Sequence, residues 1–111
     1  MIKGIGCDVV EIARLKEKLL TKILSAPEII LYDSFASEKR KQEFLAGRFA
    51  LKEAIVKAIG PVPFPELIIL NDEAGKPILS CERLKHLQIH ISLAHEKAYA
   101  IGMCVAETDA L

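Results

Sequence analysis

Asp8 is the first side chain in the sequence that could take part in chemistry. It closes the run Gly4-Ile5-Gly6-Cys7-Asp8, and because side chains alternate along a strand, it shares a face with both glycines. Two positions without side chains leave space beside a carboxylate, where a hydrated cation or a phosphate could approach. Asp8 could also cap a helix that follows it, in which case the glycines mark only a close crossing of two backbones.

A second carboxylate, Glu53, lies in the apolar run from Phe44 to Ala58. On a helical wheel the large apolar residues of this run form one broad arc and the small residues a stripe opposite, so we expect a helix buried between two neighbours. Arg48 and Lys52 fall inside the large-residue arc, and buried charges are normally paired or bound to a ligand. Glu53 and Lys57, at the border of the arc, could form an ordinary surface pair.

A third segment, from His90 to His95, alternates polar and apolar side chains. His90 and Ser92 share one face of the predicted strand, the apolar residues share the other, and His95 stands at its end. All three polar side chains could donate to phosphate oxygens, or they could simply be solvated residues on the outer face of a sheet. Nucleophilic catalysis by Ser92 is disfavoured, because the G-x-S-x-G turn that exposes such a serine is missing.

Together the three segments supply two carboxylates for a hard divalent cation and a set of donors for phosphate groups. Magnesium is commonly bound through one or two carboxylates plus substrate phosphates, which fits this inventory. The candidate donors are Arg48, Lys52, Lys57, His90, Ser92 and His95.

The overall composition excludes several classes of protein. The net charge is zero, from 15 basic and 15 acidic residues, and only 5% of residues are aromatic, which disfavours a nucleic-acid-binding protein. The three cysteines form no C-x-x-C pair, so we expect reduced thiols in a cytoplasmic protein rather than a zinc site or a disulfide framework. We expect no membrane span and no signal peptide, because no apolar run has the required length or context.

The elements that must position these side chains follow from periodicity and turn residues. Strand-like runs cover residues 2–10, 66–70, 77–80, 88–94 and 98–105, and helical patterns cover 11–24, 27–32 and 37–59. Strands thus come first and last with helices between them, which predicts one α+β domain over residues 1–111, with a small antiparallel sheet packed against a long central helix.

In this order along the chain, the three segments resemble the motifs of the bacterial holo-acyl-carrier-protein synthases, the short class of 4′-phosphopantetheinyl transferases. The first looks like the G-x-G-x-D motif of that family and the third like its H-x-S-x-x-H strand. The run Ala46-Gly-Arg-Phe-Ala-Leu-Lys-Glu-Ala-Ile-Val-Lys-Ala58 matches A-G-R-F-A-x-K-E-A-x-x-K-A nearly residue for residue. The central motif is specific, whereas each of the others would be weak alone.

The resemblance implies a fold and a reaction. A serine of apo-acyl carrier protein attacks the β-phosphate of coenzyme A, and adenosine 3′,5′-bisphosphate is released, a step of fatty acid biosynthesis. Asp8 and Glu53 would hold magnesium, and Lys57 would steady the pyrophosphate. The general base stays open between Glu53, Asp8 and a metal-bound water. The remaining candidate donors would contact the phosphates of the nucleotide: Arg48, Lys52, His90, Ser92 and His95.

The resemblance further implies a homotrimer, with each site built where two subunits meet. It also gives a role to Arg14, Lys18 and Lys22, which recur every four residues on the predicted first helix. Acyl carrier proteins are acidic and meet this helix in the family, so a basic stripe on a neutral protein suits such a partner. Without the resemblance, a solvated helix face explains the same spacing.

Two departures from the family pattern stand out. The stretch after Arg14 is short, and Pro61-Val62-Pro63-Phe64-Pro65 replaces a Gly-Thr-Gly loop that borders the substrate pocket in relatives. Coenzyme A affinity and acyl selectivity are the properties these changes would alter. They also motivate an alternative, a non-catalytic trimeric module that binds nucleotide phosphates or regulates. A different magnesium phosphotransferase is less favoured, because no P-loop is present.

Overall fold

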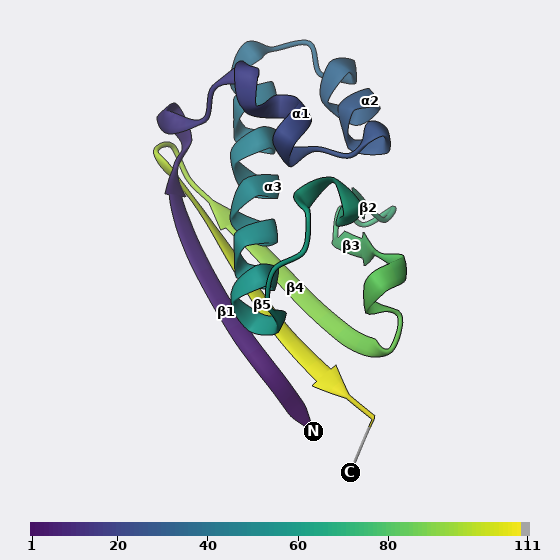
Figure 1. Cartoon of the computed structure of the whole chain (residues 1–111). Helices are drawn as coiled ribbons and strands as arrows, with labels where there is room; N and C mark the ends of the chain where they lie inside the picture. Colours follow the sequence, from purple (N-terminus) through teal and green to yellow (C-terminus); the bar gives the residue numbers. More distant parts are fainter. Residues whose placement is uncertain (110–111) are drawn as a thin grey trace.

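The computed structural model describes residues 1–109, and its elements follow the predicted order of strand, helices and strands (Figure 1). The helices and strands are β1 (Ile2–Glu11), α1 (Leu20–Ile23), α2 (Ala26–Ser34), α3 (Glu38–Ile59), β2 (Ile68–Asn71), β3 (Pro77–Ser80), β4 (Leu87–His95) and β5 (Tyr99–Thr108), with 3₁₀ helices η1 (Ile12–Arg14), η2 (Glu17–Leu19), η3 (Phe64–Glu66) and η4 (Glu82–Leu84).

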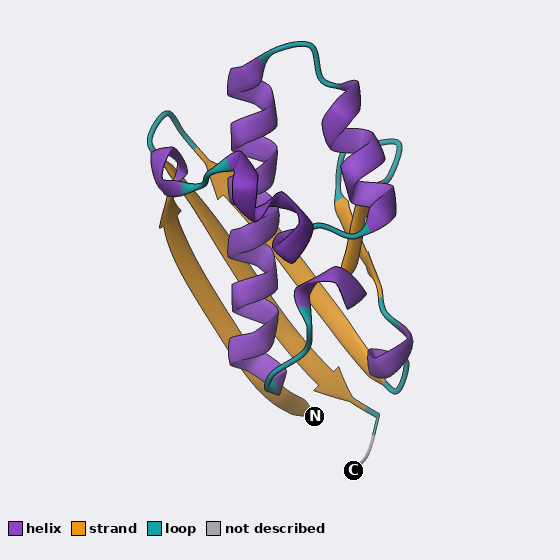
Figure 2. Ribbon diagram, turned by 45° about the horizontal axis from the view of Figure 1, so that its top comes forward, coloured by secondary structure: helices purple, strands orange, loops and turns teal. Residues whose placement is uncertain are grey.

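Three long strands form an antiparallel sheet in the order β1-β5-β4, so β1 and β4 are its edges. The helix α3 runs along one face of this sheet, and the other helices gather on the same side (Figure 2). A separate antiparallel pair, β2 and β3, lies beside α2. The predicted α+β architecture, with a small antiparallel sheet and a long central helix, is confirmed.

Glycines allow β1 and β5 to approach the backbone of α3 closely. A Cβ atom added at Gly6 would lie 1.9 Å from the carbonyl oxygen of Ala54, and one added at Gly4 equally close to that of Ala58. On β5, a Cβ at Gly102 would lie 2.6 Å from α3 backbone atoms. The two glycines of the first motif therefore mark a crossing of two backbones, and the space predicted beside Asp8 is filled by helix.

The ends of α3 match the sequence signals closely. The hydroxyl of Ser37 accepts from the backbone N–H of Arg40 at 3.0 Å, which caps the helix at its start. The helix ends at Gly60, whose φ of 102° suits a residue without a Cβ. The predicted burial is also confirmed, because α3 contacts all three strands of the sheet as well as α1 and α2.

The prediction of one helix over residues 11–24 is wrong. The segment divides into η1, η2 and the single turn of α1, with Leu15 and Lys16 in extended conformation between the first two. Backbone groups that a helix would have used bond instead to distant residues: the Ile12 N–H donates to the carbonyl of Ala98 at 2.8 Å. Within residues 1–109, no helix has the length and apolar character needed to cross a membrane.

Candidate active site

The two carboxylates predicted to act together do lie in one pocket. A cavity of about 300 Å³, called the carboxylate pocket below, is formed by β1, the middle of α3 and the segment that follows β1. It is lined by Asp8, Glu53 and Arg14. Asp8 sits within β1 opposite Gly102, not at a helix start, and the N-cap of η1 is Glu11. The helix-cap explanation of Asp8 is therefore excluded, although its neighbouring glycines serve packing.

Lys57 is paired with Asp8 rather than with Glu53. Its ammonium group lies 3.0 Å from Asp8 Oδ1 and donates to the carbonyl of Cys7, also at 3.0 Å. The hydrogen bond to Asp8 raises the pKa of Lys57 above its ordinary value, so the cation is fully charged at neutral pH. The i,i+4 surface pair that the sequence allowed is replaced by a contact between α3 and β1.

The residues of this pocket fit a magnesium ion. Carboxylate oxygens are the hard donors that magnesium prefers, and Asp8 is only partly exposed, with a side-chain exposure of 16%. Among the residues that the structure describes, no group of three or more His, Cys, Asp or Glu side chains gathers around one point. Two carboxylates fill only part of an octahedral shell, so oxygens of water or substrate would complete it.

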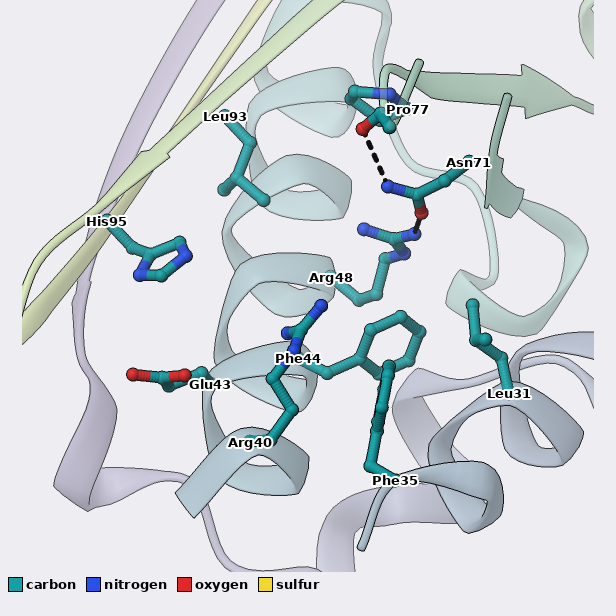
Figure 3. Close-up of a pocket in the computed structure, with 11 residues that line it drawn as sticks. Leu31, Phe35, Arg40, Glu43, Phe44, Arg48, Asn71, Pro77, Leu93 and His95 are labelled. Atoms are coloured by element: carbon teal, nitrogen blue, oxygen red, sulfur yellow. Dashed lines mark hydrogen bonds between the residues drawn. The ribbon is translucent and has the colours of Figure 1, made fainter. Parts of the chain in front are cut away.

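A second pocket, of about 420 Å³, is lined by Arg40 and Arg48 of α3 and by the end of β4, and is called the arginine pocket below. Figure 3 shows Arg40, Arg48 and His95 around it. The guanidinium of Arg40 lies 4.4 Å from the ring centroid of Phe35, and that of Arg48 lies 4.5 Å from the ring of Phe44. Aromatic rings thus support both arginines on the pocket wall, where they suit an anion.

Arg48 is held in place by polar contacts as well. Its Nε donates to the carbonyl of Ile69 at 3.0 Å, and its Nη2 donates to Asn71 Oδ1 on the same strand, β2. Burial, opposed by Glu28 and assisted to a smaller extent by the nearby Arg40, lowers the pKa of Arg48 to about 10. The guanidinium remains protonated at neutral pH, and its other amino group points into the pocket (Figure 3).

Lys52, one of the residues predicted to bind phosphate, has no donor available to a ligand in this structure. Its side chain is fully buried, and its ammonium group donates to Glu28 Oε1 at 2.6 Å and to the carbonyls of Ile23 and Phe64 at 2.7 and 3.0 Å. All three protons are used inside the fold, so none is left for a ligand. Burial lowers the pKa of Lys52. Lys52 is a structural residue.

The polar residues of β4 divide between the two faces of the sheet. His95 faces the α3 side and lines the arginine pocket, whereas His90 and Ser92 are exposed on the opposite face, as alternation along the strand predicts. There His90 Nε2 lies 2.7 Å from a carboxylate oxygen of Glu107. One chain therefore unites His95 with Arg48, but not with His90 or Ser92.

The three basic residues assigned to partner binding do not share one helix. Arg14 lies in η1, Lys18 in η2 and Lys22 in α1, and all three are exposed. Residues four apart share a face only within a continuous helix, and the extended residues Leu15 and Lys16 interrupt this segment. The three side chains therefore do not form the predicted stripe on a helix. Arg14 alone reaches the carboxylate pocket.

Three residues of these sites were missed in the sequence: Glu28, Arg40 and Asn71. Arg40 precedes the apolar run and carries no pattern of its own. For Glu28 a signal existed, because Ser25-x-x-Glu28 is a capping-box sequence, and the Ser25 N–H does donate to Glu28 Oε1 at 2.8 Å. Asn71 is the last residue of β2, one position beyond the predicted strand over residues 66–70, so no sequence pattern marked it.

Comparison with known proteins places this geometry in a family. A model of the 4′-phosphopantetheinyl transferase superfamily matches residues 4–104. The chain is 42% identical over 114 residues to the holo-[acyl-carrier-protein] synthase of Petrotoga mobilis, covering 95% of this chain and 96% of the relative. It is 40% identical to the Bacillus subtilis protein of the same name over 118 residues, covering 96% and 97%.

The fold agrees with solved structures of the same kind. A holo-(acyl-carrier-protein) synthase from Bacillus anthracis, in complex with CoA (3′,5′-ADP), superposes with a TM-score of 0.91 at 36% identity and covers 98% of this chain and 99% of that one. The Helicobacter pylori synthase in complex with coenzyme A gives 0.78 at 30% identity, covering 93% and 99%. The motifs, the fold and the relatives agree: the chain belongs to the 4′-phosphopantetheinyl transferase superfamily.

Proposed function

We propose that the protein transfers 4′-phosphopantetheine from coenzyme A to a serine of apo-acyl carrier protein, releasing adenosine 3′,5′-bisphosphate, as in fatty acid biosynthesis. The observation that carries the proposal is the pairing of Asp8 and Glu53 in one pocket of a fold shared with holo-acyl-carrier-protein synthases. Residues 1–111 act as one transferase domain in this proposal, which is supported by the family match over residues 4–104.

In this reaction the serine oxygen bonds to the β-phosphorus while the bond from that phosphorus to the bridging oxygen breaks. The electron pair leaves with the adenosine bisphosphate, and the serine proton goes to a base. Asp8 and Glu53 would hold magnesium, which when bound offsets negative charge on the pyrophosphate. Lys57, which is charged beside Asp8, would steady the pyrophosphate. The candidate bases are those given above: Glu53, Asp8 and a water held by the metal.

The arginine pocket is the proposed site for the nucleotide phosphates. Arg48 and His95 keep the role given by the family motifs, and Arg40 joins them on the same wall. Guanidinium groups bind phosphates well because their donors match pairs of phosphate oxygens. Lys52 has no part in this site, because its donors are used within the core.

A homotrimer with shared sites is part of the proposal. Asp8 belongs to one edge strand of the sheet and His95 to the other, so the carboxylate and arginine pockets lie on different sides of the subunit. A neighbouring subunit would bring the two kinds of pocket together. It would also allow His90 and Ser92 to contact the phosphates of a nucleotide bound between subunits. Exposed apolar residues on the outer sheet face, among them Val9 and Ile101, provide a surface for such contacts.

An acidic carrier protein is the proposed partner of the basic surface after β1. Arg14 is exposed and lines the carboxylate pocket, which the serine of the carrier would have to reach. Lys18 and Lys22 are exposed further along the same segment. A cytoplasmic location is proposed with it, since Cys7, Cys81 and Cys104 are all free thiols, as is usual in a reducing compartment.

The test is incubation of the full chain with coenzyme A, magnesium chloride and an apo-acyl carrier protein, followed by mass spectrometry of the carrier. We expect the carrier to gain one phosphopantetheine mass and the reaction to stop when EDTA is added. Binding of coenzyme A without any transfer to several carriers would instead support the non-catalytic module, which is not favoured while both carboxylates and Lys57 stand together.

A further inference from the structure

The buried carboxylate of Glu28, which lies outside the proposed reaction site, accepts four hydrogen bonds. It is fully buried in α2. Its Oε1 accepts from the backbone N–H and the hydroxyl of Ser25, both at 2.8 Å, and from Lys52 at 2.6 Å. Its Oε2 accepts from the Ile69 N–H at 3.1 Å. One carboxylate therefore joins α2, α3 and β2.

These bonds lead directly to the arginine pocket. Ile69 donates its N–H to Glu28 and accepts the Nε–H of Arg48 at its carbonyl, so the carboxylate fixes the peptide that fixes the guanidinium. Glu28 Oε2 also lies 3.8 Å from Arg48 Nε. Position and orientation of Arg48 thus depend on a residue that does not line the pocket.

Because Lys52 pairs with Glu28, the positive charge of Arg48 remains available to a ligand in the arginine pocket. Both cations face the same carboxylate, but the ammonium of Lys52 lies 2.6 Å from it, against 3.8 Å for the guanidinium. The closer pair largely neutralises itself, because electrostatic attraction falls with distance and is strong in a buried environment. Arg48 therefore keeps a positive charge that the fold does not cancel, directed at the pocket.

We propose that Glu28 is a positioning residue for coenzyme A binding: with Lys52 it locks β2 and the guanidinium of Arg48 so that one amino group stays turned into the pocket for a phosphate. The inference rests on the proposed role of that pocket as the nucleotide-phosphate site. It gives the buried Lys52 of the central motif a function that direct ligand contact does not.

The experiment is a double-mutant cycle on the full chain, with adenosine 3′,5′-bisphosphate as the probe and calorimetry as the readout. We expect Arg48→Ala to weaken binding by about 10- to 100-fold, the usual range for a charged hydrogen bond. Glu28→Gln is expected to weaken it by about 5- to 10-fold. In the Arg48→Ala background, Glu28→Gln should have no further effect, since the residue acts through Arg48. In transfer assays the KM for coenzyme A should rise, not the KM for the carrier.

A matched control is Glu66→Gln, which removes an exposed carboxylate bonded to Arg83 and should leave binding unchanged. If Glu28→Gln alone fails to fold, the pair Glu28→Gln with Lys52→Met removes the unpaired ammonium, and the cycle is run in that background. An equal loss with and without Arg48 would show a merely structural role and overturn the inference. Normal binding by Arg48→Ala would overturn the pocket assignment itself, while transfer by the wild-type chain would still stand.

Discussion

Asp8 and Glu53 are the side chains on which the proposed chemistry depends most. We expect Asp8→Asn or Glu53→Gln to reduce transfer by more than about 100-fold, because each removes a charged oxygen ligand from a site with only two carboxylates. The measurement is the initial rate of carrier modification at saturating magnesium and coenzyme A. Thermal melting should show that both variants remain folded.

Glu11→Gln is the matched control for these variants, because Glu11 is an exposed carboxylate at the end of the same strand and does not line the pocket. It should transfer at close to the wild-type rate. Full activity of Asp8→Asn combined with Glu53→Gln would contradict the metal assignment, whatever the effect of the control.

We expect the thiol of Cys104 to make the free energy of unfolding depend on pH in the alkaline range. Its thiol is buried under α3, and burial raises its pKa from 9.0 to about 11. The unfolded chain therefore loses this proton at lower pH than the folded chain. The contribution of the protonated thiol to the free energy of unfolding is complete below about pH 9 and is lost as the pH rises through 11. Relative to Cys104→Ala, wild type should lose about 2 kcal/mol of unfolding free energy by pH 11, measured by urea denaturation across that range. A pH-independent difference between the two proteins would contradict the assignment.

Residue types alone could not separate Arg48 from Lys52. Both are cations in the apolar arc of the same helix, and the motif treats them alike. What separates them is Glu28, which is distant in sequence and meets Lys52 only after α2 has folded against α3. The wheel correctly predicted buried charges, but the identity of the partner is a tertiary fact.

At the scale of elements, the contact of β1 with α3 depends on residues without side chains. Gly6→Ala should destabilise the protein by about 3 kcal/mol or more, because the new methyl group would overlap a backbone carbonyl that cannot move without shifting the helix. The change in unfolding free energy can be measured by urea denaturation. Cys7→Ala, next in sequence but exposed on the other face, is the control and should be nearly neutral. A stable Gly6→Ala variant would mean that β1 sits further from the helix.

The segment from Glu11 to Leu24 shows what periodicity can and cannot predict. Four apolar residues would fall on one face of the predicted helix: Ile12, Leu15, Leu19 and Ile23. All of them except the half-buried Leu19 are buried. The segment is nevertheless not a helix, because its polar backbone groups bond to other elements: Gln42 donates to the Leu15 carbonyl. Burial follows from residue type, whereas the hydrogen-bond partners come from the rest of the chain.

Arg14 differs from the other basic residues of this segment in reaching the carboxylate pocket. We expect Arg14→Glu to raise the KM for an acidic carrier by about 10-fold or more, and far more than the KM for coenzyme A, because the reversed charge opposes the acidic surface of the protein partner. Steady-state assays varying each substrate in turn measure both constants. Lys85→Glu, an exposed reversal in a different part of the chain, controls for net charge. Equal increases in both KM values would argue against a docking role.

At the scale of the whole molecule, the sequence indicated which side chains work together but not on which side of the subunit they lie. Strand order puts β1 and β4 at opposite edges of the sheet, with β5 between them. That order requires pairing between chain ends, which local patterns do not encode. In the proposed trimer, the motifs at the head and tail of the chain would meet where a second subunit completes the site.

The outer sheet face is where such an assembly can be tested. Val9 and Ile101 pair across β1 and β5 and are 61% and 41% exposed, with further apolar side chains on the same face: Ile5, Tyr99 and Met103. We expect Val9→Lys with Ile101→Lys to convert a trimer into monomers, because two buried ammonium groups per subunit would have no partner in an apolar contact. Sedimentation equilibrium measures the mass, and transfer should fall together with it.

Ile30→Lys is the matched control for that variant, since Ile30 is an apolar residue of α2 with 72% exposure that lies outside the sheet. It should leave both mass and activity unchanged. A monomeric double variant that keeps full activity would show that one subunit holds a complete site. Because Asp8 and His95 belong to opposite edges of the sheet, we expect the reverse: loss of the trimer separates the carboxylates from the arginine pocket and stops transfer.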